Sequence, residues 1–441
     1  MAKKVLAGNW CGTHTIPASQ LYPHQWNWDS GFIAIGYARY DLDKACQELR
    51  SLFRAQWHNG MLPHIVFNPA EADYFPGPEF WQTSRSPAAP KDVPSSGITQ
   101  PPVHAIAALQ IFRRSGQALA RDFLKEMFPK IKSLHRYLYA YRDPYKEGLA
   151  YVGHPWETGT DNSPAWDEPL NRMDPRSLGP LDYRRKDLRL VSPDQRPTQA
   201  DYDRYVYLAE IYKRSDYHEE TIFRESPFLV QDPLFNGILC KANEDLIEIA
   251  EILGEDSGEI REWHQQTRRA VDAKLWSEHC RLYTSYDLVQ RRQLAADSIS
   301  GFIPLFAGIP GPERAQELLK RLESPGFSGR REECFSVPSY DIESVAFDPV
   351  SYWRGPVWVN MDWMLYHGLR RYGFHEKAMA VRRDVLALAS RFGFYEYFSP
   401  YRSRDRGEIG GLGGAGFSWT AALCIDLIAE PEDHWGDMNA R

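Results

Sequence analysis

The sequence lacks the features of membrane, secreted and metal-binding proteins. A membrane-spanning helix needs roughly 18–20 consecutive apolar residues, and the chain contains no such run. The first ten residues start with basic side chains but have no long apolar stretch after them, so no signal peptide is predicted. Only six cysteines occur, widely spaced and without a CxxC pair, so neither a disulfide framework nor a zinc site is expected. We expect a cytoplasmic protein without a bound metal.

The sequence also lacks an excess of positive charge and the common catalytic motifs. Its net charge of −7 and pI near 6.0 argue against binding nucleic acid. No GxxxxGK[ST], HExxH or GxSxG motif is present. Residues 411–416 match GxGxxG and precede a predicted helix, but no strand is predicted before them, so a dinucleotide site is not expected. A mobile glycine loop over a pocket is the preferred interpretation, and no cofactor is expected.

Strand signals are few, whereas helical periodicity recurs along the whole chain. The best strand candidates are residues 63–67 and 148–152. The pattern predicts an all-α fold of about twelve helices, which can close into an α/α toroid. We expect one domain over residues 1–441, with loop or cap insertions at about 58–100 and 143–200. Helices are predicted over residues 43–57, 103–114, 119–142, 201–215, 232–253, 257–276, 312–322, 358–371, 376–392 and 417–429.

Two short stretches hold carboxylates among aromatic, Gly and Pro residues. Asp161 lies in the first, over residues 156–167, and Glu396 in the second, over residues 394–400. Aromatic walls desolvate a carboxylate and raise its pKa, and glycosidic cleavage requires two carboxyl groups with different pKa values. We assign Asp161 as general acid and Glu396 as general base, which in an inverting enzyme stand roughly 6.5–9.5 Å apart.

Alternatives exist for both carboxylates. Glu157 and Asp167 are rival acids in the first stretch, and Asp161 could simply form an Asx turn. Glu396 could be an exposed residue at a helix end.

Aromatic residues make up 13% of the chain, which is consistent either with sugar binding or with a large helical core. Trp26 and Trp28 could stack on a sugar, and Asp29 could accept its hydroxyl hydrogen bonds. The alternative is that Asp29 or Ser30 caps the next helix. Gln100, held extended by the following prolines, could reach a ligand or satisfy loop backbone.

Several other polar residues have both a functional and a structural interpretation. Arg196 and Tyr202 could bind an anionic group, although a solvated Arg and a core Tyr are the simpler interpretation. Arg354 could pair with a catalytic carboxylate or form a structural ion pair. His58 and His64 are more simply loop histidines with satisfied hydrogen bonds.

At these residues the chain resembles glycoside hydrolase family 63, and within it the bacterial branch of glucosylglycerate and mannosylglycerate hydrolases. The resemblance implies an (α/α)6 barrel, inversion at the anomeric carbon, Asp161 as acid and Glu396 as base. It places Tyr22, Trp26, Asp29, Gln100 and Trp358 at the sugar, and Tyr74, Arg196 and Tyr202 at the glycerate. The motifs that carry the resemblance are residues 22–29, 74–78, 96–104, 161–164, 195–197, 202–205, 352–358, 396–397 and 418–421.

Trp28, Gly159, Trp353 and Trp419 complete the predicted substrate-binding set. Phe417 departs from the branch, which has a Gln there that would help to hold glycerate. A neutral or differently shaped aglycone is therefore an alternative.

The expected function is an inverting, exo-acting α-glycosidase for a small α-glucoside or α-mannoside, with glucosylglycerate or mannosylglycerate as the leading substrate. Alternatives are an α-glucosidase for another short glucoside, a phosphorylase or epimerase on the same barrel, and a sugar-binding protein without activity. The expected partner is a small carbohydrate, and a homo-oligomer is possible.

Overall fold

The computed structural model describes residues 1–71, 73–115 and 118–431, and six helical segments form a closed inner ring. Each segment contacts the next one in chain order, and the last contacts the first, so the ring closes between the two ends of the chain. Five are α-helices, and the fourth, η7, is a 3₁₀ helix. In ring order they are α2 (Asn27–Tyr37), α5 (His104–Arg114), α11 (Pro233–Leu253), η7 (Ile299–Leu305), α14 (Val359–Arg371) and α16 (Ser418–Ala429).

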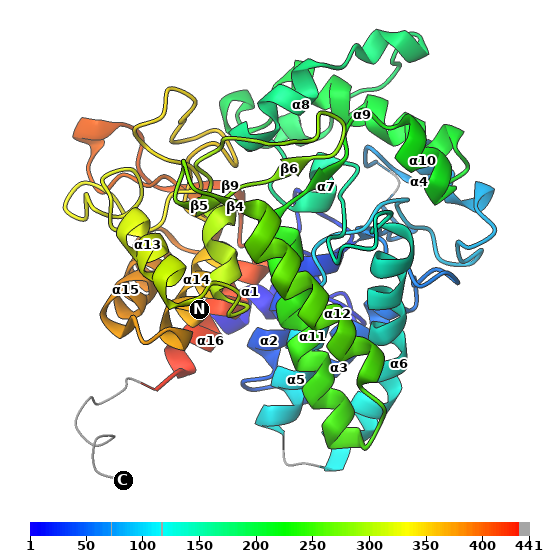
Figure 1. Cartoon of the computed structure of the whole chain (residues 1–441), viewed down its shortest axis with the longest axis horizontal. Coiled ribbons are helices and arrows are strands. Elements are labelled where there is room, and N and C mark those ends of the chain that lie inside the picture. The colour runs from blue at the N-terminus through cyan, green and yellow to red at the C-terminus, as the bar shows by residue number, and fades with distance from the viewer. Residues whose placement is uncertain (72, 116–117, 432–441) are drawn as a thin grey trace.

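An outer layer of helices covers this ring. α3, α6, α12, α15 and α1 each contact at least one inner helix, and α13 contacts β5, which itself contacts η7. Figure 1 shows α12 lying along α11, and α13, α14 and α15 grouped together. This arrangement is an (α/α)6 toroid, as predicted. The outer helices are α1 (Ala2–Gly8), α3 (Leu42–Phe53), α6 (Ala118–Tyr141), α12 (Gly258–Ala270), α13 (Pro312–Leu322) and α15 (His375–Phe392).

Local signals explain where several helices begin and end. In α11, Asp232 caps the first turn by accepting a hydrogen bond from the amide of Phe235, Pro233 follows at the first position, and Gly254 ends the helix with a φ of 78°. Helix α13 also has a proline, Pro312, at its first position, but no side-chain cap. The buried apolar side chains form one main cluster that runs from Leu6 to Leu427.

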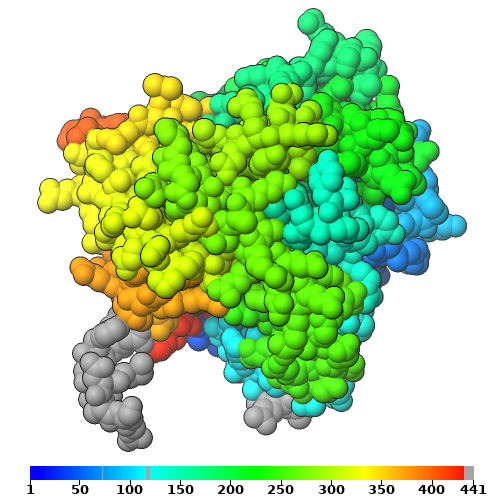
Figure 2. Space-filling view, in the orientation of Figure 1, coloured from blue at the N-terminus to red at the C-terminus, as the bar shows by residue number. Residues whose placement is uncertain are grey.

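Short elements and long loops gather at one end of the ring. Figure 1 shows α8, α9 and α10 together at the top, and Figure 2 shows the green segment near residues 170–215 covering that end. The assignment of residues 1–441 to one domain with two insertions stays a prediction, and residues 432–441 lie outside the described residues. The α-helices at this end of the ring are α4 (Pro78–Trp81), α7 (Pro155–Thr158), α8 (Asp167–Asn171), α9 (Gln199–Arg214) and α10 (Glu219–Glu225). The other helical turns are η1 (Thr83–Arg85), η2 (Pro164–Trp166), η3 (Pro175–Leu178), η4 (Asp187–Arg189), η5 (Pro193–Gln195), η6 (Val271–Leu275) and η8 (Arg404–Arg406).

The strands are short and antiparallel, and they differ from the prediction. The predicted strand at 63–67 is confirmed as β2, but in 148–152 only Val152 forms a bridge, with Val230. The glycine-rich segment 411–416 was predicted as a loop and instead forms β9, which pairs with β8. The pairs are β1 (Gln25–Trp26) with β2 (Ile65–Val66), β3 (Val230–Gln231) with β6 (Tyr286–Asp287), β6 with β7 (Arg292–Gln293), β4 (Trp276–Ser277) with β5 (Leu282–Tyr283), and β8 (Tyr395–Phe398) with β9 (Gly411–Ala415).

The structure also corrects two interpretations of helix starts. Asp29 and Ser30 do not cap α2, because this helix already begins at Asn27 and both residues lie in its first turn. The helix predicted over residues 201–215 begins earlier, at Gln199, so its first predicted residue, Asp201, is not the cap of α9. The cap is Thr198. The side chain of Asp201, at the third helical position, accepts a hydrogen bond from the backbone amide of Thr198, which completes a capping box. Within the described part of the chain, no helix is both long and apolar enough to cross a membrane.

Candidate active site

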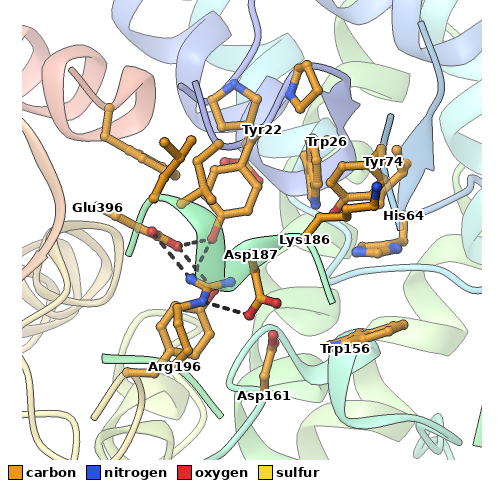
Figure 3. Close-up of a pocket in the computed structure, with 18 of the residues that line it drawn as sticks. Tyr22, Trp26, His64, Tyr74, Trp156, Asp161, Lys186, Asp187, Arg196 and Glu396 are labelled. Atoms are coloured by element: carbon orange, nitrogen blue, oxygen red, sulfur yellow. Dashed lines mark hydrogen bonds and ion pairs between the residues drawn. The ribbon is translucent and has the colours of Figure 1, made fainter. Parts of the chain in front are cut away.

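The loops at the decorated end of the toroid surround a cavity of about 460 Å³. Figure 3 shows residues from distant parts of the chain pointing into it, with Glu396 and Tyr22 on one side and His64 and Trp156 on the other. Every residue predicted to act in catalysis or substrate binding lines this cavity, whereas their individual roles stay predictions. These residues are Tyr22, Trp26, Trp28, Asp29, Tyr74, Gln100, Gly159, Asp161, Arg196, Tyr202, Trp353, Trp358, Glu396 and Trp419.

Glu396 is held by a dense set of hydrogen-bond donors. Its Oε1 accepts from the hydroxyls of Tyr22, at 2.8 Å, and Tyr352, at 3.1 Å, and its Oε2 accepts from the amide of Gly414 at 3.0 Å. The Nη1 of Arg196 lies 3.7 Å from Oε2. Burial raises the pKa of Glu396, and Arg196 and the three donors oppose this effect without cancelling it. Glu396 is therefore not an exposed residue at a helix end.

The glycine-rich strand β9 is part of this carboxylate's surroundings. Gly413 has a φ of 67°, and a Cβ atom there would lie 2.4 Å from Oε2 of Glu396. Only glycine lets the backbone approach so closely, and this approach allows the next amide to donate to the carboxylate. The motif thus has a positional role beside Glu396.

Asp161 lies in the loop between α7 and η2, across the cavity from Tyr22 (Figure 3). Burial raises its pKa to about 7, with a further increase from the charge of Glu396 and a decrease from Arg196. A carboxyl group with this pKa is partly protonated near neutral pH, as a general acid must be.

The loop that carries Asp161 is fixed by its neighbours. Gly159 has a φ of 78°, and a Cβ there would lie 2.5 Å from the Trp28 ring. The Asn162 side chain accepts a hydrogen bond from the amide of Trp353 at 2.8 Å. These contacts hold the backbone on both sides of Asp161, whose side chain lines the cavity.

The two alternative acids, Glu157 and Asp167, bind other protein groups, and neither lines the cavity. Glu157 accepts hydrogen bonds from Arg142, at 2.9 Å, and from the amide of Gly153, at 2.7 Å. Asp167 forms a two-pronged ion pair with Arg354 at 2.7 and 2.8 Å. For Arg354 the structural interpretation is therefore correct.

Aromatic rings form the wall beside the two carboxyl groups. The Trp353 and Trp358 rings stack with centroids 3.7 Å apart and planes 4° apart, and Trp28 meets Trp419 edge-on at 5.5 Å. Flat apolar faces of this kind suit the C–H face of a sugar ring.

Two polar side chains complete this part of the cavity. Asp29 has a pKa well above its ordinary value, because of burial and the nearby charge of Glu396. The side-chain oxygen of Gln100 accepts from the amide of Trp28 at 3.3 Å, so Gln100 both supports the backbone and lines the cavity.

Arg196 is the main cation of the site. It is only 7% exposed, so the interpretation as a solvated loop Arg was wrong. Its Nη1 donates to the hydroxyl of Tyr22 at 2.8 Å, and its Nε donates to Asp187 at 3.3 Å. Tyr202 is buried as a core Tyr would be, yet it lines the cavity and carries the guanidinium of Arg185 over its ring at 4.4 Å.

Sequence reasoning missed several cavity residues. Tyr352 was part of a recognised motif, but nothing in the sequence indicated that it would bind Glu396. Asp187 and Lys186 lie in a segment without any motif. His64 was expected to be a satisfied loop histidine, but it lines the cavity, its Nδ1 has no hydrogen-bond partner within the described residues, and burial lowers its pKa to about 3.

The match to a known family decides the class of this site. The model of the mannosylglycerate hydrolase MGH1-like glycoside hydrolase domain matches residues 22–420. The chain belongs to this family. It is therefore a glycoside hydrolase, and among the described residues of this hydrolase no group of three or more His, Cys, Asp or Glu side chains is arranged to hold a metal ion.

Individual relatives match over nearly the full length of this glycoside hydrolase. The mannosylglycerate hydrolase of Rubrobacter radiotolerans is 46% identical over 97% of this chain and 96% of its own, and the glucosylglycerate hydrolase of Mycolicibacterium hassiacum is 36% identical over 97% and 96%. A crystal structure of a mannosylglycerate hydrolase from Thermus thermophilus in complex with Tris and D-glycerate superposes with a TM-score of 0.88 at 44% identity, covering 96% of this chain and 98% of that one.

Proposed function

We propose that this glycoside hydrolase cleaves the α-glycosidic bond of a glycosylglycerate with inversion, using Asp161 as general acid and Glu396 as general base. The proposal rests mainly on two carboxyl groups that face one cavity in different surroundings. Burial raises the pKa of both groups, but three hydrogen-bond donors and a nearby guanidinium oppose this rise at Glu396 and favour its charged form, whereas the pKa of Asp161 reaches about 7. One group is thus suited to accept a proton and the other to donate one.

The reaction needs one water molecule and two proton transfers. The terminal sugar lies against Trp353 and Trp358, with Asp29 and Gln100 within reach of its hydroxyl groups. As the bond between the anomeric carbon and the bridging oxygen breaks, Asp161 gives its proton to that oxygen. A water molecule attacks the anomeric carbon from the opposite face and loses a proton to Glu396, which yields the inverted sugar and the free aglycone.

The proposed aglycone, glycerate, is based on the substrates named for the relatives and on the guanidinium of Arg196 at the site. The relatives are named as mannosylglycerate and glucosylglycerate hydrolases, and D-glycerate is present in the Thermus structure. In this chain, Arg196 offers a guanidinium and Tyr74 and Tyr202 offer hydroxyl groups along the same cavity. These groups suit the carboxylate and hydroxyls of glycerate. We propose mannosylglycerate and glucosylglycerate as substrates.

A hydrolysis screen tests the proposal. α-Mannosyl and α-glucosyl derivatives of D-glycerate and of glycerol are incubated with the enzyme in buffer with and without phosphate, and the anomer released first is identified by NMR. Release of the β-anomer from a glycosylglycerate is expected. Retention of the α-configuration would exclude the assigned roles, and a requirement for phosphate would indicate a phosphorylase.

Two variants test the carboxyl groups separately. Asp161→Asn and Glu396→Gln should each reduce kcat by about 10²–10⁴-fold, the usual contribution of an acid or base group, without loss of folding. Asp167→Asn is the matched control, since it changes a carboxylate of the same stretch that is outside the cavity and 43% exposed. Near-normal kcat in either catalytic variant contradicts its role.

A further inference from the structure

Arg196 is already paired with a carboxylate of the protein. Its Nε donates to Oδ2 of Asp187 at 3.3 Å, and Figure 3 shows the Asp187 side chain reaching toward Arg196 inside the cavity. A second guanidinium, that of Arg185, donates two hydrogen bonds to the same carboxylate, at 3.0 and 2.6 Å. Asp187 is the first residue of the three-residue turn η4.

The charges of this group are balanced without a ligand. The guanidinium groups of Arg185 and Arg196 carry two positive charges, and the carboxylates of Asp187 and Glu396 carry two negative ones. The Asp187 side chain is only 12% exposed, and that of Arg196 is 8% exposed. An additional carboxylate that enters this buried group can pair with a cation only if one of these two carboxylates gives up its guanidinium, and an unpaired charge is costly in a partly desolvated site.

Asp187 binds Arg196 less strongly than it binds Arg185. Arg185 holds Asp187 with two short hydrogen bonds and is itself anchored on the carbonyl of Pro197 at 2.8 Å. Arg196 is held through Tyr22. A carboxylate that displaced Asp187 from Arg196 would break one long hydrogen bond and leave the pair of Asp187 and Arg185 intact.

We propose that Asp187 is a specificity-determining residue that occupies the anion site of Arg196 in the empty enzyme and yields this site to the carboxylate of the substrate. The inference rests on the proposed function, because it requires an acidic aglycone. A glycerate carboxylate can take the place of Asp187 with two parallel hydrogen bonds to the planar guanidinium. A neutral aglycone cannot displace it, so the Asp187 side chain continues to fill part of the cavity and such substrates bind less well.

The test is a titration that requires no turnover. D-Glycerate is titrated into the full-length wild-type enzyme and into Asp187→Asn, and the dissociation constants are measured by calorimetry. The variant should bind D-glycerate on the order of three- to tenfold more tightly, the scale of one partly screened ion pair. Glycerol and glucose should bind equally to both proteins. An unchanged or weaker affinity for D-glycerate in the variant overturns the proposal.

A matched control separates the local effect from a change in net charge. Asp73 pairs with Lys186 and Arg189 at the same rim, but its side chain is 66% exposed. Asp73→Asn removes the same charge and should leave the affinity for D-glycerate within about twofold of wild type, as expected for an exposed pair. Equal gains in Asp73→Asn and Asp187→Asn would show a general charge effect and refute the specific role. Asp187→Ala, checked for folding by circular dichroism, serves if the Asn variant does not fold.

Turnover then separates this inference from the proposed function. If the wild-type enzyme cleaves a glycosylglycerate, Asp187→Asn should lower its KM without a matching change in kcat, and should leave the KM of the glycosylglycerol unchanged. Cleavage by the wild type with equal KM changes for both substrates refutes the role of Asp187 alone. If the wild type cleaves no glycosylglycerate, the proposed function fails, and the D-glycerate titration still decides whether Asp187 competes for Arg196.

Discussion

Replacement of Tyr22 by Phe removes one atom from the centre of the proposed base site. The Tyr22 hydroxyl donates to Oε1 of Glu396 at 2.8 Å and accepts from Nη1 of Arg196 at 2.8 Å. A Phe ring can keep the edge-on contact with Trp26, whose centroid is 5.1 Å away. The variant therefore changes the electrostatics around Glu396 with little change in packing.

The size of the effect follows from the hydrogen bond that is lost. A hydrogen bond to a charged group contributes about 1.5–3 kcal/mol, and one pKa unit corresponds to about 1.4 kcal/mol. Because the Tyr22 hydroxyl stabilises the ionised carboxylate, its removal should raise the pKa of Glu396, by about one to two units. Two donors remain, from Tyr352 and Gly414, so the carboxylate stays in place.

The assay is the pH dependence of kcat/KM for the best substrate of the screen. Activity should be lost at the acidic end because a proton on Glu396 removes the base, and the midpoint of this loss should lie about one to two pH units higher in Tyr22→Phe than in wild type. Tyr352→Phe should shift it in the same direction by less, since its hydrogen bond is longer. An acidic midpoint that stays in place or moves to lower pH in Tyr22→Phe would refute the assignment of Glu396 as base.

Three further substitutions test other parts of the site. Gly159→Ala should destabilise the protein by about 1–3 kcal/mol in urea unfolding, because φ is 78° and the new Cβ would meet Trp28 at 2.5 Å; unchanged stability would show that the loop relaxes freely. Asp29→Asn should keep kcat/KM within about tenfold of wild type, since the raised pKa of Asp29 favours the neutral form, and Asp29→Ala should lose more; equal losses would indicate that the charge of Asp29 matters. Phe417→Gln should lower the KM for glycosylglycerate relative to glycosylglycerol, because it places an amide on the cavity wall at the position where the family resemblance implies a Gln that helps to hold glycerate; parallel changes for both substrates would argue against a contact with glycerate.

Most of the helical framework was predictable because its signals are local. The bounds of α13, 312–322, were predicted without error, and those of α5, α11, α14 and α16 to within one residue at each end. Proline at the first turn, capping carboxylates and a terminal glycine act within a few residues of the helix end. Asp29 and Asp201, which were wrongly interpreted as helix starts, each lie in the first turn of a helix that begins two residues before them.

The contacts of the candidate site were not predictable in the same way. Tyr22 and Glu396 are 374 residues apart in sequence, and no local pattern predicts the hydrogen bond between them. Arg196 and Tyr22 are 174 residues apart. The first of these separations is bridged by the closure of the helical ring between α16 and α2, which is a property of the whole fold. Composition and motif resemblance therefore indicated which residues take part, but not how they are paired.

Strand β8 shows why the alternative interpretation of Glu396, as an exposed residue at a helix end, does not hold. In a half-buried strand, a charged side chain is normally taken to face solvent, and its apolar neighbours to face the core. Here Tyr397 stacks on Trp358 with centroids 4.6 Å apart, and Glu396 faces the cavity instead, where it is 2% exposed. The alternation of side chains is ordinary, but the polar side of the strand faces the inside of the molecule. In a toroid whose inner end forms a cavity, a lone carboxylate in a short aromatic strand is thus better interpreted as a cavity residue than as a surface one, and the hydrogen bonds from Tyr22, Tyr352 and Gly414 supply the polar contacts that water would give it at a surface.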